Sequence, residues 1–218
     1  MIPIRDVNPH RSFPVVNLTI IVLCSLAWLY EVSLSEEGFY DFISLYGLVP
    51  VHLLDRPQTL VTHMFLHGGW LHIIGNLWFL WVFGDNVEDR LGKVRYLLFY
   101  ILSGLGAGLI QTVVSLIFGG EDVPMVGASG AISGVLGAYM WLFPRARILA
   151  LVPIVFFFTF LEIPAVFFIG LWVLIQVVNG IISLPFADMG GVAWFAHIGG
   201  FVLGYLLVRK FYAGGYRY

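Results

Sequence analysis

The sequence has 218 residues, of which 60% are hydrophobic, 17% aromatic and only 11% charged. Globular proteins carry about 25% charged residues, so a water-soluble fold cannot bury this much apolar surface. With a mean hydropathy of +0.92, the chain is predicted to be an all-α integral membrane protein. Its length allows about six or seven spans of about 20 residues, which predicts one membrane domain over residues 1–218. The formal net charge of −2 gives no reason to expect nucleic acid as a partner.

The first apolar run, at about 15–31, follows a polar, proline-containing stretch. The run lacks a small-residue cleavage site and is too long for the core of a signal peptide, so we expect a retained first helix. The single cysteine, Cys24, lies inside this run and therefore cannot form a disulfide within the chain.

Five further apolar runs predict a bundle of six membrane helices. In chain order, the predicted helices lie at about 15–31, 69–84, 96–118, 129–143, 161–181 and 192–211. The run 129–143 is short for a span, but a short helix is tolerated where protein surrounds it and water reaches one end. An additional apolar patch at 148–160 contains Pro153 and four phenylalanines. We interpret this patch as a short interfacial or re-entrant connection.

The first external connection, over about residues 32–62, is long and unusually apolar. Aromatic and aliphatic residues mixed with a few acidic ones are typical of a segment lying in the membrane interface. An ordered external cap fits the same composition equally well.

The distribution of basic residues predicts the orientation in the membrane. With six spans, ten of the eleven Lys and Arg residues fall on one side and only Arg56 falls on the other. Because cytoplasmic loops are enriched in Lys and Arg, both termini are predicted to be cytoplasmic.

Four polar residues on three of the predicted helices share one depth in the membrane. Ser129 opens the fourth run, His72 and Asn76 lie in the first two turns of the second, and His197 lies near the start of the sixth. At about 1.5 Å per residue, all four fall within about 10 Å of the external boundary. Polar side chains in lipid are costly and usually face a cavity, so this convergence predicts a functional site.

These four residues have the chemistry of a serine hydrolase. A serine hydroxyl is a poor nucleophile until a base takes its proton. A neutral His197 can act as base toward Ser129 and later as acid toward a leaving amine. Backbone N–H groups at the helix start, with the Asn76 amide and His72, can stabilise an oxyanion.

No carboxylate is well placed to complete a triad, so we predict a Ser–His dyad. Asp188 lies nine residues before His197 in a predicted loop, and Glu162 begins the fifth run at the cytoplasmic end. Asp188 stays as a minor alternative for orienting the histidine. Ser133 is a rival nucleophile, but it lies one turn deeper, where water is scarcer.

Small residues explain how the fourth and sixth helices can approach each other. They are Gly130, Gly134, Gly137 and Ala138 on the fourth run, and Ala196, Gly200 and Gly204 on the sixth. Small residues spaced four apart allow close backbone contact between membrane helices. Such contact would bring the short Ser129 side chain within hydrogen-bond reach of His197.

A metal site is the alternative use of the histidines. His63 and His67 have the i, i+4 spacing of a zinc-binding helix. The residues between them are Met-Phe-Leu, with no glutamate to act as base, and Gly68-Gly69 breaks the register before His72. Histidines bracing a loop are the favoured interpretation, and no metal or cofactor is predicted.

Three segments, "HMFLHGGWLHIIGN", "GASGAISG" and "AHIGGFVLG", together resemble the rhomboid intramembrane serine proteases, and the resemblance extends over nearly the whole chain. It implies Ser129 as nucleophile and His197 as base, with His72, Asn76 and Gly127 as oxyanion and water-cavity residues. It also implies a six-helix bundle that cleaves transmembrane segments of other membrane proteins. We expect the bilayer of a prokaryotic cell as its location, with the active site toward the external side.

The chain departs from the family pattern at two places. Many members carry an aromatic residue four positions after the nucleophile, where it stacks on the histidine ring, whereas this chain has Ser133. The imidazole must then be positioned by other contacts, for which the Ser133 hydroxyl is a candidate. Many members also have a Trp-Arg pair in the first external loop, where this chain reads Asp55-Arg56-Pro57-Gln58.

Two other functions fit a membrane bundle with buried polar residues. A small transporter or channel would continue its polar residues to the cytoplasmic face, but apolar residues follow both Asn76 and His197. A cavity closed at its base suits water delivery better than transport. A catalytically silent relative that binds transmembrane helices is the other alternative.

Overall fold

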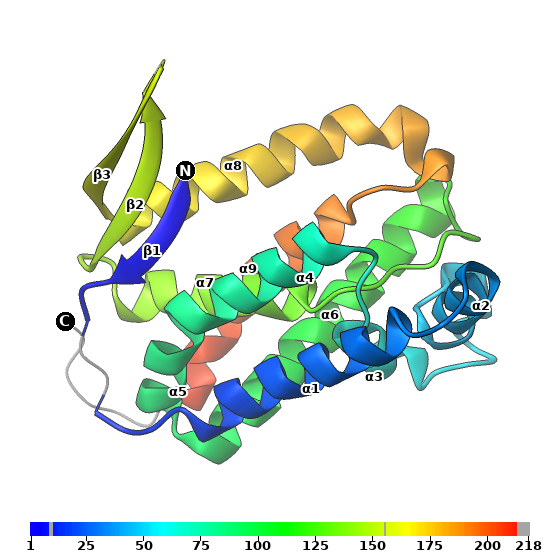
Figure 1. The fold of residues 1–218 in the computed structure, drawn as a ribbon, viewed down its shortest axis with the longest axis horizontal. Coiled ribbons are helices and arrows are strands. Elements are labelled where there is room, and N and C mark those ends of the chain that lie inside the picture. Colours follow the sequence, from blue (N-terminus) through cyan, green and yellow to red (C-terminus); the bar gives the residue numbers. More distant parts are fainter. Residues whose placement is uncertain (9–10, 155, 213–218) are drawn as a thin grey trace.

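Long helices lying side by side make up most of the fold in the computed structural model, which describes residues 1–8, 11–154 and 156–212 (Figure 1). The helices are α1 (Val15–Glu31), α2 (Glu36–Tyr46), α3 (Thr59–Thr62), α4 (Trp70–Phe79), α5 (Asp85–Leu91), α6 (Lys93–Phe118), α7 (Ser129–Leu142), α8 (Ala165–Ser183) and α9 (Trp194–Phe211). A π-helical segment, Leu80–Gly84, joins α4 to α5. The second helical segment therefore extends to Leu91, beyond the predicted end at 84.

Two segments in the described part of the chain are long and apolar enough to cross a membrane, namely α6 and Ala165–Met189. The second of these joins α8 to the short helical segment Leu184–Met189. Helices α1 and α7 are apolar but shorter, with 17 and 14 residues.

Helix α7 lies in the centre of the fold and contacts both α6 and α9. Twelve of its 14 residues are buried. A helix that is apolar on every face needs such a position, because it has no polar face to expose to water. Surrounding protein thus compensates for the shortness of α7.

A three-stranded antiparallel sheet corrects the prediction of an all-α fold. Its strands are β1 (Ile2–Asp6), β2 (Arg147–Ile154) and β3 (Phe157–Pro164), in the order β1-β2-β3. The apolar patch at 148–160, predicted as a short interfacial or re-entrant connection, forms the hairpin β2–β3, with Ile148 paired to Ile163. β-Branched and aromatic side chains favour strands, and residues before a proline disfavour the helical region. Helix α8 accordingly starts after Pro164, whereas the predicted fifth helix began at 161.

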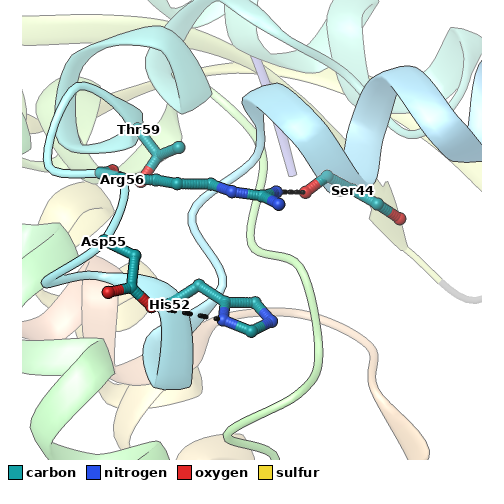
Figure 2. A network of polar contacts seen from close by, with 5 residues as sticks. All are labelled: Ser44, His52, Asp55, Arg56 and Thr59. Carbon is teal, nitrogen blue, oxygen red and sulfur yellow. Dashed lines mark hydrogen bonds and ion pairs between the residues drawn. The ribbon is translucent and has the colours of Figure 1, made fainter.

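The first connection, 32–62, folds into α2, α3 and a short 3₁₀ turn at Pro50–His52. Figure 2 shows that Arg56 extends toward α2, where its Nη1 donates to the Ser44 carbonyl at 3.3 Å. The Thr59 hydroxyl donates to the Arg56 carbonyl at 2.7 Å, and His52 Nδ1 lies 4.0 Å from the Asp55 carboxylate. The His52–Asp55 pair is exposed and contributes at most about 1 kcal/mol. Arg56 therefore helps to fix this connection through a backbone carbonyl.

Strand β1 is held against the helices by a polar cluster around Asp6. The Tyr139 hydroxyl and the Asn86 amide donate to Asp6 Oδ2 at 2.7 and 2.8 Å. The Asn8 amide in turn donates to the Tyr139 hydroxyl at 2.9 Å. Burial raises the pKa of Asp6 from 3.8 to about 6, although these hydrogen bonds oppose the shift. The docked strand therefore favours the protonated carboxyl.

We expect the docking of β1 to weaken as the pH rises from about 4 to about 6. A carboxyl with a raised pKa in the docked state stabilises that state fully below its ordinary pKa of 3.8, and the contribution is lost by about pH 6. Asp6→Asn keeps an oxygen that accepts from Tyr139 and Asn86, and it should remove this pH dependence. Hydrogen exchange of the β1 amides, corrected for the intrinsic rate at each pH, measures the effect. Equal pH dependence in wild type and variant would contradict the assignment.

Candidate active site

The structure brings Ser129 and His197 into hydrogen-bond contact at the starts of α7 and α9. The Ser129 hydroxyl and His197 Nε2 lie 2.8 Å apart. The two residues are 68 positions apart in the chain, so helix packing alone creates the contact. Ser129 is partly exposed and His197 is buried. This is the geometry of a nucleophile and its general base.

Glycines permit the close approach of α7 and α9. A Cβ atom added at Gly200 would clash with the Gly130 carbonyl, and one added at Gly204 would clash with the backbone of Gly134. The backbones of the two helices are therefore in direct contact next to Ser129. The predicted small-residue faces are the faces that meet here.

A glutamine that the sequence analysis missed holds the other side of the imidazole. His197 Nδ1 lies 2.8 Å from Gln176 Oε1, and the Gln176 amide nitrogen donates to the Trp172 carbonyl at 3.1 Å. Gln176 lies in the middle of α8 and is buried. A polar residue in an apolar run was the available signal, because such residues usually face the interior of a bundle.

Two tryptophans complete the surroundings of His197. The Trp172 ring lies 5.9 Å from the imidazole at an angle of 33°, and the Trp194 ring meets it edge-on at 6.2 Å. The Ser133 hydroxyl instead donates to the Ser129 carbonyl at 2.6 Å. The candidate role of Ser133 in positioning the imidazole is therefore wrong. Contacts from α8 and from the start of α9 position the ring.

The two carboxylates considered as a third member have other contacts. Asp188 Oδ1 accepts a hydrogen bond from the Gly120 backbone at 2.6 Å. Glu162 lies in β3, where its carboxylate is 4.0 Å from Arg147. Neither carboxylate is the group that contacts His197 Nδ1, since Gln176 occupies that place.

His72 presents a donor to the space beside Ser129. The Gly68 backbone N–H donates to His72 Nδ1 at 3.3 Å, which leaves the proton of a neutral ring on Nε2. A Cβ added at Gly127 would lie only 2.6 Å from that Nε2 and 3.5 Å from the Ser129 hydroxyl. His72 Nε2 therefore lies close to Ser129, and the missing side chain of Gly127 leaves the space for it.

Gly127 and Asn76 contribute differently from each other. Gly127 has φ +125°, a conformation that favours glycine. Its N–H donates to the His63 carbonyl at 2.9 Å, so this group is already engaged and Gly127 supplies space for His72. The Asn76 amide nitrogen is buried and has no hydrogen-bond partner within the described part of the chain. It is a donor without an acceptor among the described residues.

His63 and His67 both lie in the interior. His63 Nδ1 contacts the Thr59 carbonyl at 2.8 Å. The His67 ring packs edge-on against His72 at 5.2 Å, and its backbone N–H lies 3.3 Å from the Glu31 carboxylate. Within residues 1–8, 11–154 and 156–212, no group of three or more His, Cys, Asp or Glu side chains is placed to hold a metal ion.

A cavity of about 950 Å³ lies between the helices at the Ser129–His197 contact. Its lining includes Ser129, His197, His72, Asn76 and Gln176, contributed by α4, α7, α8 and α9. A substrate chain in this cavity would meet a serine–histidine pair on one wall and the donors of α4 on another. The arrangement suits acyl transfer, in which a nucleophile and oxyanion donors act on one carbonyl.

Comparison with known proteins assigns the chain to a family. Residues 55–213 match the Rhomboid domain. "RHOMBOID-like protein 6, mitochondrial" of Arabidopsis thaliana is 30% identical over 159 residues, which are 70% of this chain and 43% of that protein. "Putative rhomboid protease YdcA" of Bacillus subtilis (strain 168) is 32% identical over 135 residues, which are 61% of this chain and 64% of that protein.

The helical fold, with the Ser129–His197 contact beside a cavity, fits a family of membrane-embedded proteins. The chain belongs to the rhomboid family. Rhomboid proteins are membrane-embedded, and most are serine proteases. The aligned segments span between 43% and 64% of the length of the two relatives described above.

We expect Gly200→Ala to lower the free energy of unfolding by about 1–3 kcal/mol, because an added methyl group overpacks the α7–α9 contact. Gly170→Ala in α8 is the matched control, since a Cβ there has no neighbour within 4 Å. Alanine is the better helix former by about 0.5–1 kcal/mol, so this control should be neutral or stabilising. Denaturant unfolding in detergent micelles measures both. Equal stability of the two variants would contradict the close backbone contact.

Proposed function

We propose that this protein is an intramembrane serine endopeptidase that uses a Ser129–His197 dyad. The observation that carries the proposal is the 2.8 Å contact between the Ser129 hydroxyl and His197 Nε2 at the wall of a large cavity. Family membership supports it, as does the relative named a rhomboid protease. The substrates would be peptide bonds within or next to transmembrane segments of other proteins.

In the proposed mechanism, His197 Nε2 takes the proton of Ser129 as the hydroxyl oxygen attacks the substrate carbonyl. The resulting imidazolium gives that proton to the leaving amine, and the peptide C–N bond breaks. An acyl-enzyme ester remains on Ser129. A water molecule, deprotonated by His197, then attacks the ester and releases the new carboxyl group, so that both residues return to their starting state.

Three sources of hydrogen-bond donors are proposed for the oxyanion of the tetrahedral intermediate. They are the Nε2–H of His72, the amide of Asn76 and the backbone N–H groups in the first turn of α7. The first N–H groups of a helix have no carbonyl partner within that helix. Donors that are already oriented toward a developing negative charge lower the barrier without further reorganisation.

The proposed topology has six membrane crossings, made by α1, the α4–α5 segment, α6, α7, α8 and α9. Both termini would be cytoplasmic because Lys and Arg concentrate on that side. The dyad would then lie near the external surface of a prokaryotic cell membrane. This position gives water access to the acyl-enzyme while the substrate stays in the bilayer.

A helical substrate hides its carbonyls in i, i+4 hydrogen bonds, so it must unwind before Ser129 can attack. Segments weakened by Gly or Pro should be favoured, since these residues destabilise a helix by about 1 and 3 kcal/mol. The gap between Gly127 and His72 beside Ser129 is narrow, since a Cβ added at Gly127 would lie 2.6 Å from His72 Nε2. A small residue before the cleaved bond is therefore expected.

Cleavage of a transmembrane reporter in proteoliposomes tests the dyad. Ser129→Ala and His197→Ala should each lose at least about 10³-fold in rate, because removing either member of a nucleophile–base pair removes the covalent route. Ser133→Ala is the matched control, and it should keep most of the activity because that hydroxyl contacts the Ser129 carbonyl. Undiminished cleavage by either dyad variant would reject the proposal.

The same preparation separates the two alternative functions. Solute flux that a serine-directed inhibitor leaves unchanged would indicate a transporter or channel. Absence of labelling of Ser129 by a serine-reactive probe would indicate a silent relative that binds transmembrane helices.

Asn76→Leu tests the oxyanion role separately. The substitution keeps the approximate volume but removes a donor, and loss of one such donor lowers kcat by about 10²–10³-fold. KM should change little, because the donor acts mainly in the transition state. A rise in KM with unchanged kcat would instead indicate that Asn76 binds the substrate.

A further inference from the structure

We propose that Gln176 is a positioning residue that sets the tautomer of His197, an inference that rests on the proposed function. Its amide oxygen accepts from Nδ1, so the lone pair of the imidazole lies on Nε2, where the Ser129 hydroxyl is. Gln176 thus takes the place that a carboxylate holds in a catalytic triad.

The first step of the argument is the direction of the Gln176 amide. Its nitrogen lies 3.1 Å from the Trp172 carbonyl, one turn earlier in α8. A carbonyl oxygen only accepts hydrogen bonds, so the –NH₂ group must face it. The amide oxygen then faces His197 Nδ1 at 2.8 Å. The Trp172 carbonyl of α8 therefore fixes the orientation of the Gln176 amide, with its oxygen toward His197.

The second step is the proton on His197. Because an amide oxygen is only an acceptor, Nδ1 must be the protonated nitrogen of the neutral ring. Nε2 then carries the lone pair, 2.8 Å from the Ser129 hydroxyl. This is the tautomer that a general base for serine requires. The opposite tautomer would place two lone pairs against each other at Nδ1 and leave no base at Ser129.

The third step is burial. Gln176 is 5% exposed and His197 is 9% exposed. In a low-dielectric interior such a hydrogen bond is stronger than in water. Leaving Nδ1–H without a partner there would be costly. A neutral acceptor also avoids placing a charged carboxylate in an apolar helix.

Helix α8 contributes a second restraint on the same ring. Trp172 supplies the carbonyl that orients Gln176, and its indole ring also lies 5.9 Å from the imidazole. One helical turn therefore limits both the rotation and the tilt of His197. The aromatic residue expected at position 133 becomes dispensable.

Gln176→Met and Gln176→Glu test the proposal in the same proteoliposome assay. Methionine fills a similar volume but is a poor acceptor, so kcat/KM should fall by about 10- to 100-fold, as expected for the loss of a hydrogen bond to a group that becomes charged. Glutamate restores an acceptor and should return kcat/KM to within about tenfold of wild type. Gln111→Met, which removes a partly buried amide that accepts from the α9 backbone N–H of Ala196, is the matched control.

The tautomer itself is measured by ¹⁵N NMR of histidine-labelled protein in micelles, with His197→Ala assigning the signal. Wild type and Gln111→Met should show His197 protonated at Nδ1, whereas Gln176→Met should show mixed or inverted tautomers. Protonation at Nε2 in wild type would overturn the proposal even if every Gln176 variant failed to fold. Unchanged kcat/KM and tautomer in a folded Gln176→Met would overturn it as well.

Ser129→Ala, assayed in parallel, distinguishes this inference from the proposed function. If Ser129→Ala keeps its activity, the dyad itself is wrong. If Ser129→Ala is inactive while Gln176→Met equals wild type in rate and tautomer, only the role of Gln176 is wrong.

Discussion

Direct backbone contact between α7 and α9 is the constraint on which the other features depend. Serine has one of the shortest polar side chains, so Ser129 reaches His197 only because glycines such as Gly200 and Gly204 leave nothing between the two helices. The same contact buries nearly all of α7, which allows a 14-residue helix to occupy the centre of the fold. The same residues therefore determine the helix packing and the geometry of the site. Substitution of one of these glycines should change both the α7–α9 packing and the distance between Ser129 and His197.

Features set by spacing along a single helix could be predicted from the sequence. Small residues four apart and polar residues at one depth predict that Ser129, His197, His72 and Asn76 lie near one another, and the structure brings all four to one cavity. Gln176 could not be predicted from local spacing because its contact with His197 joins two helices, and because a neutral amide lacks the charge that marks the usual orienting carboxylate. A neutral amide in an aliphatic run carries a weaker signal, although its burial follows from the same principle.

The sheet was missed for a different reason. The residues of β2 and β3 are apolar on both faces, so they lack the alternation that distinguishes a half-buried strand from a buried or interfacial segment. Strand β1 is only five residues long. Its partner strand β2 follows the first four predicted helices in the sequence, so that Asp6 pairs with Ile148. A local sequence pattern cannot predict a pairing between strands so far apart in the chain. Gly127 likewise belongs to a sequence motif, whereas its hydrogen bond to the His63 carbonyl could not be predicted.

The pairing of β1 with β2 also has a topological consequence. Two strands can share a ladder only on the same side of a bilayer, so the chain between Asp6 and Arg147 must cross the membrane an even number of times. The four crossings proposed for α1, the α4–α5 segment, α6 and α7 would satisfy this parity. If one of these four segments lay on the membrane surface instead, β1 and β2 would lie on opposite sides of the bilayer and could not pair. The sheet therefore requires an even number of membrane crossings between β1 and β2, and this requirement does not depend on the distribution of Lys and Arg.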